Sequence, residues 1–198
     1  MWRKGIGGKL KSQKKELLSL SKPKTTHMII LYVFLGIIAL VLLVAAVLPG
    51  KYLVEKSTII SRPPAEVYNK IANLNYYRDW NPWAKTDPDA QSSVTGSPMQ
   101  VGHKYYWNGK KVGEGSLTVR STVPSKAINF DLVFLKPFKS EAIDAWDFTE
   151  VEGGTKVVWR NSGAFPFPVA RLMGPSITKQ LNTQFEDGLR NLKEMCEK

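Results

Sequence analysis

The longest hydrophobic segment of the chain, residues 28–48, contains no charged residue. As an α-helix it would be about 31 Å long, close to the thickness of the hydrocarbon core of a bilayer. The core helix of a soluble protein has polar residues at helical spacing, and the apolar region of a signal peptide is shorter and ends at a small-x-small cleavage site. Here Ala45, Ala46 and Val47 lead into Leu-Pro-Gly. We predict a retained transmembrane helix over residues 27–49; a cleaved signal peptide is the alternative.

The charges on the two sides of this segment predict its orientation. Residues 1–26 contain eight Lys or Arg and one acidic residue, whereas positions 49–68 contain only three basic residues. The more basic side of a membrane span stays in the cytoplasm. We therefore expect a basic cytoplasmic tail over 1–26, insertion in the inner (plasma) membrane, and an extracytoplasmic domain over 51–198. Tyr32 and Tyr52, near the two ends of the span, are typical of the membrane interface.

Downstream of residue 50 the pattern changes to short β-branched and aromatic segments separated by Gly, Pro and Asn, which predicts antiparallel strands. Alternation places residues 128, 130, 132 and 134 on one face of a strand, and Leu117, Val119 and Val123 on one face of the strand before it. The sequence EGGT at 152–155 predicts a hairpin turn. The predicted strands are 52–61, 92–95, 102–109, 113–123, 126–135, 140–151 and 155–163.

Two helical patterns accompany these strands. PPAEVYNKIAN (63–73) has prolines and Glu66 where the first turn of a helix tolerates them. After Pro175, apolar residues recur at spacings of three and four, which predicts a long amphipathic helix that covers the sheet. Gly188 on this helix would allow close approach to the sheet. The segment 163–175, rich in Phe and Pro, is expected to be irregular and to form either a lid over a cavity or a rigid linker. The apolar positions are Ile177, Leu181, Phe185, Leu189, Leu192 and Met195.

Composition narrows the range of functions. The net charge is +11, but the tail carries +7 of it and residues 51–198 only +4, so the charge indicates attraction to anionic lipids rather than to nucleic acid. One cysteine, Cys196, excludes an internal disulfide, and two histidines, His27 and His103, do not provide a zinc site. We expect no metal and no cofactor. The sequence does not indicate an oligomeric state.

The catalytic candidates are weak. His103 is the default general base because its unperturbed pKa lies near neutrality, although a histidine beside a glycine turn is more often at the surface or at a rim. Asp144 could orient a ligand hydroxyl or pair with His103, or it could face solvent. If Trp146 and Trp159 point inward, then Asp144 and Asn161 share their face; which face of 102–109 is inner stays open.

The binding candidates are aromatic. Near the start of the domain, Tyr76, Tyr77, Trp80 and Trp83 admit three interpretations: core packing, a gate to a cavity, or anchoring at the membrane interface. The predicted ligand-binding residues are Trp80, Trp83, Tyr105, Trp107, Phe130, Phe134, Trp146, Trp159 and Phe185.

The ordered series of these segments resembles the START/birch-pollen-allergen (SRPBCC) superfamily, in particular its polyketide cyclase/dehydrase-like members. The resemblance covers about residues 51–197. It implies an α+β helix-grip fold with an apolar cavity between a curved antiparallel sheet and the C-terminal helix, a cavity that in this superfamily takes lipids, sterols or polyketides. No catalytic signature of the superfamily can be transferred to this chain. The matching segments are EKSTIISRPPAEVYNKIAN, YYRDWNPW, VGHKYYWNG with GEGSLTV, GGTKVVWRNSG and FEDGLRNLK.

Three functions remain open at this point. The first is a membrane-anchored domain that binds a hydrophobic small molecule or lipid. The second is a cyclase- or hydrolase-like enzyme acting in the same cavity, which would rest on His103 and Asp144. The third is an interaction or stress-response module whose core is filled by its bulky side chains. The absence of a catalytic signature favours the first over the second.

Overall fold

The computed structural model describes residues 23–198. Most of the predicted basic tail, residues 1–22, lies outside the described residues. The chain divides into two compact units, Met1–Val47 and Leu48–Lys198. The first contains helix α2, Pro23–Val47. Within the described part of the chain, its segment Thr26–Val47 is the one helix long and apolar enough to cross a membrane. Such a helix near the N-terminus is either a membrane anchor or a signal sequence.

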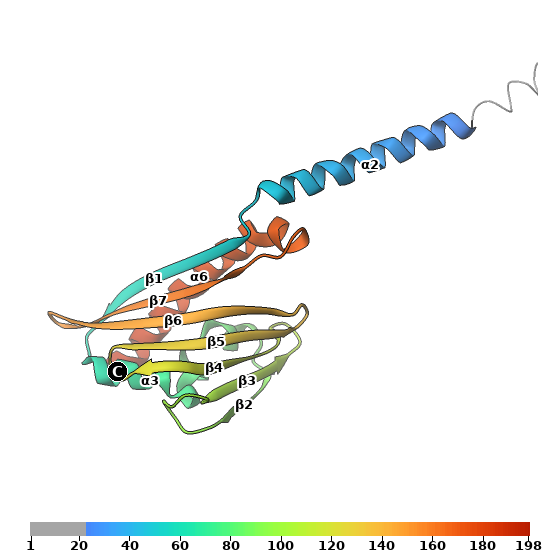
Figure 1. Ribbon diagram of the computed structural model, residues 1–198. Coiled ribbons are helices and arrows are strands. Elements are labelled where there is room, and N and C mark those ends of the chain that lie inside the picture. The colour runs from blue at the N-terminus through green and yellow to red at the C-terminus, as the bar shows by residue number, and fades with distance from the viewer. Residues whose placement is uncertain (1–22) are drawn as a thin grey trace, which may run out of the picture. The chain divides into compact units, whose positions relative to one another are not determined.

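The second unit is a seven-stranded antiparallel sheet with one long helix against it (Figure 1). Strand order is β1-β7-β6-β5-β4-β3-β2, a meander in which the first strand returns beside the last. This is the predicted α+β helix-grip fold. The elements are β1 (Lys51–Ile60), α3 (Pro64–Ala72), η1 (Leu74–Tyr76), α4 (Tyr77–Trp80), α5 (Pro82–Thr86), β2 (Gln91–Thr95), β3 (Lys104–Gly109), β4 (Gly113–Val123), β5 (Ala127–Lys136), β6 (Ser140–Val151), β7 (Gly154–Ala164) and α6 (Val169–Glu197).

The predicted face of β4 is correct for Leu117 and Val119, which are buried, and wrong for Val123, which is 52% exposed. The pairing of β4 with β5 shifts between Val119 and Ser121. A bulge inserts one residue and reverses which side chains face the core beyond it. Thr122 therefore points inward, where its hydroxyl is hydrogen-bonded to the hydroxyl of Tyr68.

Helix α6 begins at Val169 and runs through Pro175, so the prediction that 163–175 is irregular is wrong for most of that segment. A proline inside a helix lacks an N–H and usually excludes helical backbone at the residue before it, where Cβ meets the ring. That residue is Gly174, which has no Cβ. Gly174 also packs against Phe165, whose ring would lie 2.8 Å from a Cβ at this position. The glycine therefore permits both the proline and the close contact.

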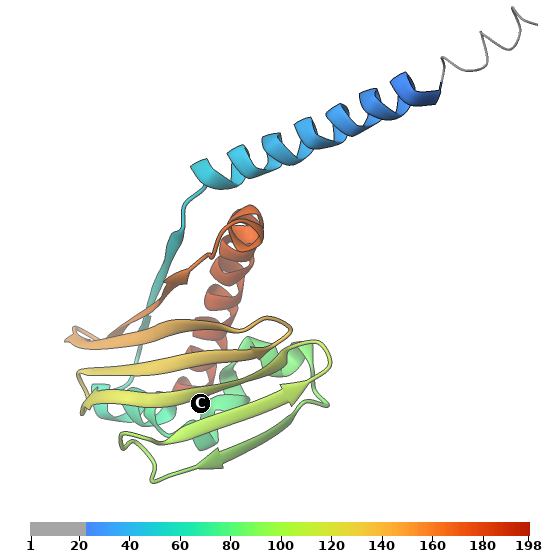
Figure 2. The same ribbon diagram turned by 45° about the vertical axis from the view of Figure 1, so that its right-hand side comes forward.

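In both views α6 lies behind the sheet and runs obliquely to its strands (Figure 2), and β1 is the strand that it contacts most. The C-terminal end of α6 is fixed beside the start of α3, where the Arg62 side chain donates to the backbone oxygen of Cys196 at 2.8 Å. Midway along, Gly188 lets α6 approach the sheet as predicted, since a Cβ there would lie 2.8 Å from Cζ3 of Trp159. The hydrophobic core runs from Val54 to Cys196 and lies wholly within Leu48–Lys198.

Candidate functional site: a cavity between the sheet and helix α6

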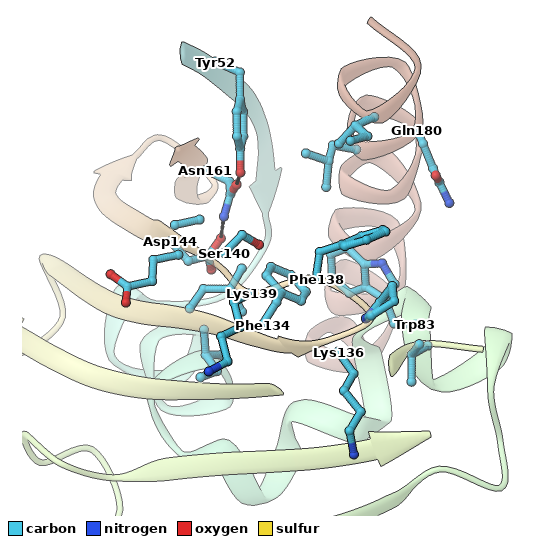
Figure 3. Close-up of a pocket in the computed structure, with 18 of the residues that line it drawn as sticks. Tyr52, Trp83, Phe134, Lys136, Phe138, Lys139, Ser140, Asp144, Asn161 and Gln180 are labelled. Carbon is cyan, nitrogen blue, oxygen red and sulfur yellow. Dashed lines mark hydrogen bonds between the residues drawn. The ribbon is translucent and has the colours of Figure 1, made fainter. Parts of the chain in front are cut away.

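A cavity of about 830 Å³ lies between the inner face of the sheet and α6 (Figure 3). A volume of this size is typical of sites for small molecules and cofactors. Strands β1 and β3–β7, helices α4 and α5, and the first half of α6 all contribute to its wall. Its lining is mainly apolar and aromatic and includes Tyr77, Trp83, Tyr105, Trp107, Leu117, Leu132, Phe134, Trp159, Ile177, Leu181 and Phe185.

The structure brings most of the predicted ligand-binding residues together around this cavity. Trp83, Tyr105, Trp107, Phe134, Trp159 and Phe185 line it. The alternation on β3 is thereby resolved, because Tyr105 and Trp107 face inward. The other three predicted residues, Trp80, Phe130 and Trp146, are at most 1% exposed and belong to the core instead.

One end of the cavity is closed by stacked aromatic rings. The ring of Phe185 on α6 stacks on Trp159 with 3.7 Å between centroids, and Trp159 stacks on Trp146 at 4.4 Å. Trp80 meets both indoles edge to face. These bulky side chains fill one half of the domain, as the filled-core hypothesis expected, but the other half contains the cavity. That hypothesis is therefore not supported.

The polar centre of the cavity wall is Asp144 on β6. Its Oδ1 accepts hydrogen bonds from the indole Nε1 of Trp159 at 2.8 Å and from Nδ2 of Asn161 at 3.2 Å. Its Oδ2 accepts one bond, from Nε1 of Trp146 at 2.9 Å. The hydroxyl of Tyr52 donates to Oδ1 of Asn161 at 2.9 Å and completes a chain of polar groups from β1 to β6 (Figure 3). The prediction that Asp144 and Asn161 share the inner face is confirmed by their direct pairing across β6 and β7.

This carboxyl group is buried without a cationic partner. Asp144 is 5% exposed and takes part in none of the ion pairs among the described residues. Burial raises the pKa of Asp144 to about 6, against the lowering effect of the three N–H donors. Burial, and secondly the negative charge of Asp144, raise the pKa of Tyr52 to about 12 and that of Tyr77 well above its usual value.

His103, the predicted general base, does not line the cavity. It is 1% exposed, so the surface or rim position expected for it is wrong. Its Nε2 accepts from the backbone N–H of Leu74 at 3.0 Å, and its Nδ1 lies 3.0 Å from the carbonyl oxygen of Thr95, which it can reach as a donor. Both ring nitrogens thus serve backbone groups before β3, and His103 and Asp144 form no pair.

The predicted aromatic cluster near the start of the domain separates into three roles. Trp80 is core, Tyr77 and Trp83 line the cavity, and Tyr76 lies outside it with the Lys70 ammonium 4.2 Å from its ring centroid. Tyr52 was expected at the membrane interface. It instead lines the cavity and stacks on Phe165 at 4.7 Å, because the alternation of β1 turns its side chain inward.

The entrance of the cavity was predicted only in part: the segment 163–175 was expected to form either a lid over a cavity or a rigid linker, and the β5–β6 turn was not expected to take part. The entrance is formed by the β5–β6 turn and by the segment that leads from β7 into α6, and its apolar side chains are unusually exposed: Phe138 73%, Phe167 50%, Val169 60% and Met173 48%. Basic side chains stand among them. Lys136 and Lys139 flank Phe138, and the Arg171 guanidinium lies 5.7 Å from the centroid of the Phe167 ring. The enrichment of Phe and Pro at 163–168 is the sequence feature that indicates this entrance.

Comparison with known proteins places this geometry in a family. The model of the family described as polyketide cyclase/dehydrase and lipid transport matches residues 52–197. A search of curated proteins found no significant match.

Among solved structures, protein CV1439 from Chromobacterium violaceum is 14% identical with a TM-score of 0.56, over 74% of this chain and 97% of that one. The Aha1 dimer from Colwellia psychrerythraea is 17% identical with a TM-score of 0.53, over 74% and 96%. Ara h 8.0201 is 10% identical with a TM-score of 0.53, over 74% and 98%.

These likenesses concern the fold. The same fold makes up almost the whole of the CV1439 chain. In this chain, Leu48–Lys198 forms one compact unit that contains the core cluster of the described residues. Since the family model covers nearly all of that unit, the chain belongs to the polyketide cyclase/dehydrase and lipid transport family, within the SRPBCC superfamily.

Proposed function

We propose that the domain Leu48–Lys198 binds one hydrophobic small molecule or lipid in the cavity between the sheet and α6, and that α2 anchors it to the membrane from which this ligand is taken. The observation that carries the proposal is the cavity itself: about 830 Å³ of space with a mainly apolar and aromatic wall. An empty apolar space of this size costs stability, because its lining loses contacts that a ligand restores.

The composition of the entrance supports exchange with a lipid surface. Phe138, Phe167 and Val169 are exposed and all line the same cavity, whereas soluble monomers rarely expose large contiguous apolar patches. Lys139 and Arg171 stand beside them, as does Lys136, whose ammonium is paired with Glu114 at 2.6 Å. Aromatic side chains inserted at head-group depth, with neighbouring bases on anionic head groups, form the usual arrangement of a protein that rests on a membrane.

The chain connectivity supports the same role. The folded unit begins at Leu48, directly after the apolar helix ends at Val47. Two residues further, the backbone oxygen of Gly50 accepts from the N–H of Phe165 at 2.9 Å, so the start of the domain is fixed to the segment that forms the entrance. A membrane span at Thr26–Val47 would hold this entrance within a few residues of the bilayer. The basic flank predicts that the domain is extracytoplasmic.

Binding is favoured over catalysis by the position of the titratable groups. The ring nitrogens of His103 are committed to backbone groups of Leu74, Thr95 and Gly96, away from the cavity. Two carboxyl groups are buried in the cavity wall among the described residues, those of Asp144 and Asp87, and the partners of both are N–H donors rather than a second acid–base group. An enzyme working through the His103–Asp144 pair is therefore not proposed.

A matched pair of substitutions on β5 tests the proposal. Leu132 lines the cavity and Leu135, three residues further along the strand, is 40% exposed and does not. In Leu132→Trp the larger ring occupies ligand space, so binding of the neutral fluorescent probe N-phenyl-1-naphthylamine to residues 48–198 should weaken at least tenfold, or about 1.4 kcal/mol. Leu135→Trp should leave it unchanged. Equal binding by both variants, or no binding by the unsubstituted domain, would contradict the proposal.

A further inference from the structure

We propose that the ligand enters the cavity with a hydrogen-bond donor at its leading end, a protonated amine or a hydroxyl, and that Asp144 receives it. The inference rests on the proposed function and names the chemical class of its ligand: an amphiphile with an apolar body and a cationic or hydroxylic head, not a fatty acid or another anion.

The first step is the free acceptor capacity of the carboxylate. An ionised carboxylate has about four lone-pair positions. Oδ1 of Asp144 accepts two N–H bonds, whereas Oδ2 accepts only that of Trp146. Asp144 lines the cavity, so the remaining capacity of Oδ2 is available to a group inside it. Trp146, Trp159 and Asn161 donate N–H groups to Asp144 and present no acceptor there that would compete with it for a donor of the ligand.

The second step is the uncompensated charge. A buried carboxylate costs several kcal/mol of desolvation unless a cation or several donors accompany it. No ion pair among the described residues includes Asp144. The groups that face it are the phenols of Tyr52 on β1 and Tyr77 on α4, and neither is positively charged. A ligand ammonium would supply the missing charge, and a hydroxyl would supply one more donor.

The third step concerns the rest of the wall. The lining contributed by α6 near this point is uncharged: Ile177, Gln180, Leu181 and Phe185. Aromatic faces from Tyr77, Trp83 and Tyr105 also line the cavity, and such faces attract a cation through the ring quadrupole. Among the other charged side chains of the lining, Arg78, Lys136, Lys139 and Glu141 are exposed. Asp87 is buried, and its Oδ2 accepts the backbone N–H groups of Lys111 and Val112. An anionic head would meet like charge at Asp144 and no buried cation.

Competition by amphiphiles of equal chain length tests this inference. In this experiment, N-phenyl-1-naphthylamine bound to residues 48–198 is titrated at pH 7.5 with dodecylamine, 1-dodecanol or dodecanoate, each below its micelle-forming concentration. We expect dodecylamine to compete best, 1-dodecanol next, and dodecanoate at least tenfold more weakly than the amine. In Asp144→Asn the amine should lose about tenfold and dodecanoate should gain, since the amide removes the charge and keeps an oxygen acceptor.

Glu141→Gln is the matched control. It makes the same change of charge on β6, at an exposed position that also lines the cavity, and it should leave the order of the three competitors unchanged. If Asp144→Asn does not fold, the same competition is measured with the unsubstituted domain at pH 5. The advantage of dodecylamine over 1-dodecanol should then be smaller than at pH 7.5, because Asp144 takes up a proton.

The outcomes separate the inference from the proposed function. Equal competition by dodecylamine and dodecanoate, or a Glu141→Gln effect as large as that of Asp144→Asn, would overturn the inference while leaving a hydrophobic binding site in place. Failure of the probe and of all three amphiphiles to bind would overturn the proposed function itself.

Discussion

The indole N–H of Trp159 donates to Oδ1 of Asp144 at 2.8 Å, while the same indole is stacked between Phe185 and Trp146. The side chain of Trp159 thus joins the stacked rings that close one end of the cavity to a buried carboxyl group in its wall. Because the ring is held on both faces, the direction of its N–H is fixed, and so is the carboxylate that accepts it. The polar end of the cavity is therefore pre-organised before any ligand arrives.

The pH dependence of stability should reveal this carboxyl group. The pKa of Asp144 is raised from 3.8 to about 6 in the folded domain, so between these values the folded state holds a proton that the unfolded state has released. The contribution of Asp144 is thus fully present below pH 3.8 and is lost as the pH rises through about 6, by roughly 3 kcal/mol. Urea unfolding of residues 48–198 and of Asp144→Asn should diverge accordingly: the difference in unfolding free energy shifts in favour of the variant between pH 4 and pH 7. A difference that is constant with pH would contradict the assignment.

Gly188→Ala should destabilise the domain, although an alanine inside a helix normally stabilises it by about 1 kcal/mol relative to glycine. A Cβ at this position would lie 2.8 Å from Trp159 and 3.2 Å from Pro82, both in the packed interior. Overpacking of this kind costs typically 1–3 kcal/mol. Thermal or urea unfolding gives the sign directly, and an increase in stability would show that α6 does not pack closely on the sheet here.

His103→Ala should lower stability and leave ligand affinity unchanged. The substitution removes the acceptor of the buried Leu74 N–H, and leaving that donor unsatisfied costs about 1–3 kcal/mol. It also removes the partner of the Thr95 carbonyl, which is only part-buried. Urea unfolding measures the first effect, and titration with N-phenyl-1-naphthylamine in the folded range measures the second. Weakened binding by a fully folded variant would place His103 in the site after all.

The exposed phenylalanines of the entrance should control exchange with lipid. In the full-length chain reconstituted in vesicles, the double variant Phe138→Ser, Phe167→Ser should slow uptake of a fluorescent lipid by several-fold, since two apolar side chains no longer enter the interface. Leu53→Ser, which changes an apolar residue of similar exposure (62%) that does not line the cavity, is the control. Equal uptake by both variants would show that the entrance does not operate on the membrane.

The accuracy of the predictions from the sequence depends on how far apart in the chain the interacting residues lie. Period-two alternation and glycine turns located all seven strands, because alternation and turns are encoded by residues close together in the sequence. The same parity placed Asp144 and Asn161 inside. It failed at Val123, where a bulge changes the phase without any local signal. The prediction of irregular backbone over 163–175 failed at Pro175, where the missing Cβ of Gly174 makes a helical proline acceptable.

The candidate site was predictable in composition but not in extent. Nine aromatic residues were expected around a ligand, and six of them line the cavity. Alternation assigns a side chain to a face of the sheet, but it does not separate the filled end, with Trp80 and Trp146, from the open end. His103 was selected for its side-chain chemistry, and the donor that its Nε2 accepts, the Leu74 N–H, lies in a distant part of the sequence. Long-range packing of this kind leaves no local pattern.

The central claim, that the cavity holds a hydrophobic ligand, is tested most directly by native mass spectrometry of residues 48–198 purified gently from a membrane-containing host. We predict a second species with a defined additional mass in the range of lipids or other small amphiphiles, reduced in Leu132→Trp and retained in Leu135→Trp. A single species of the bare polypeptide mass, together with no uptake of added amphiphile, would contradict the claim.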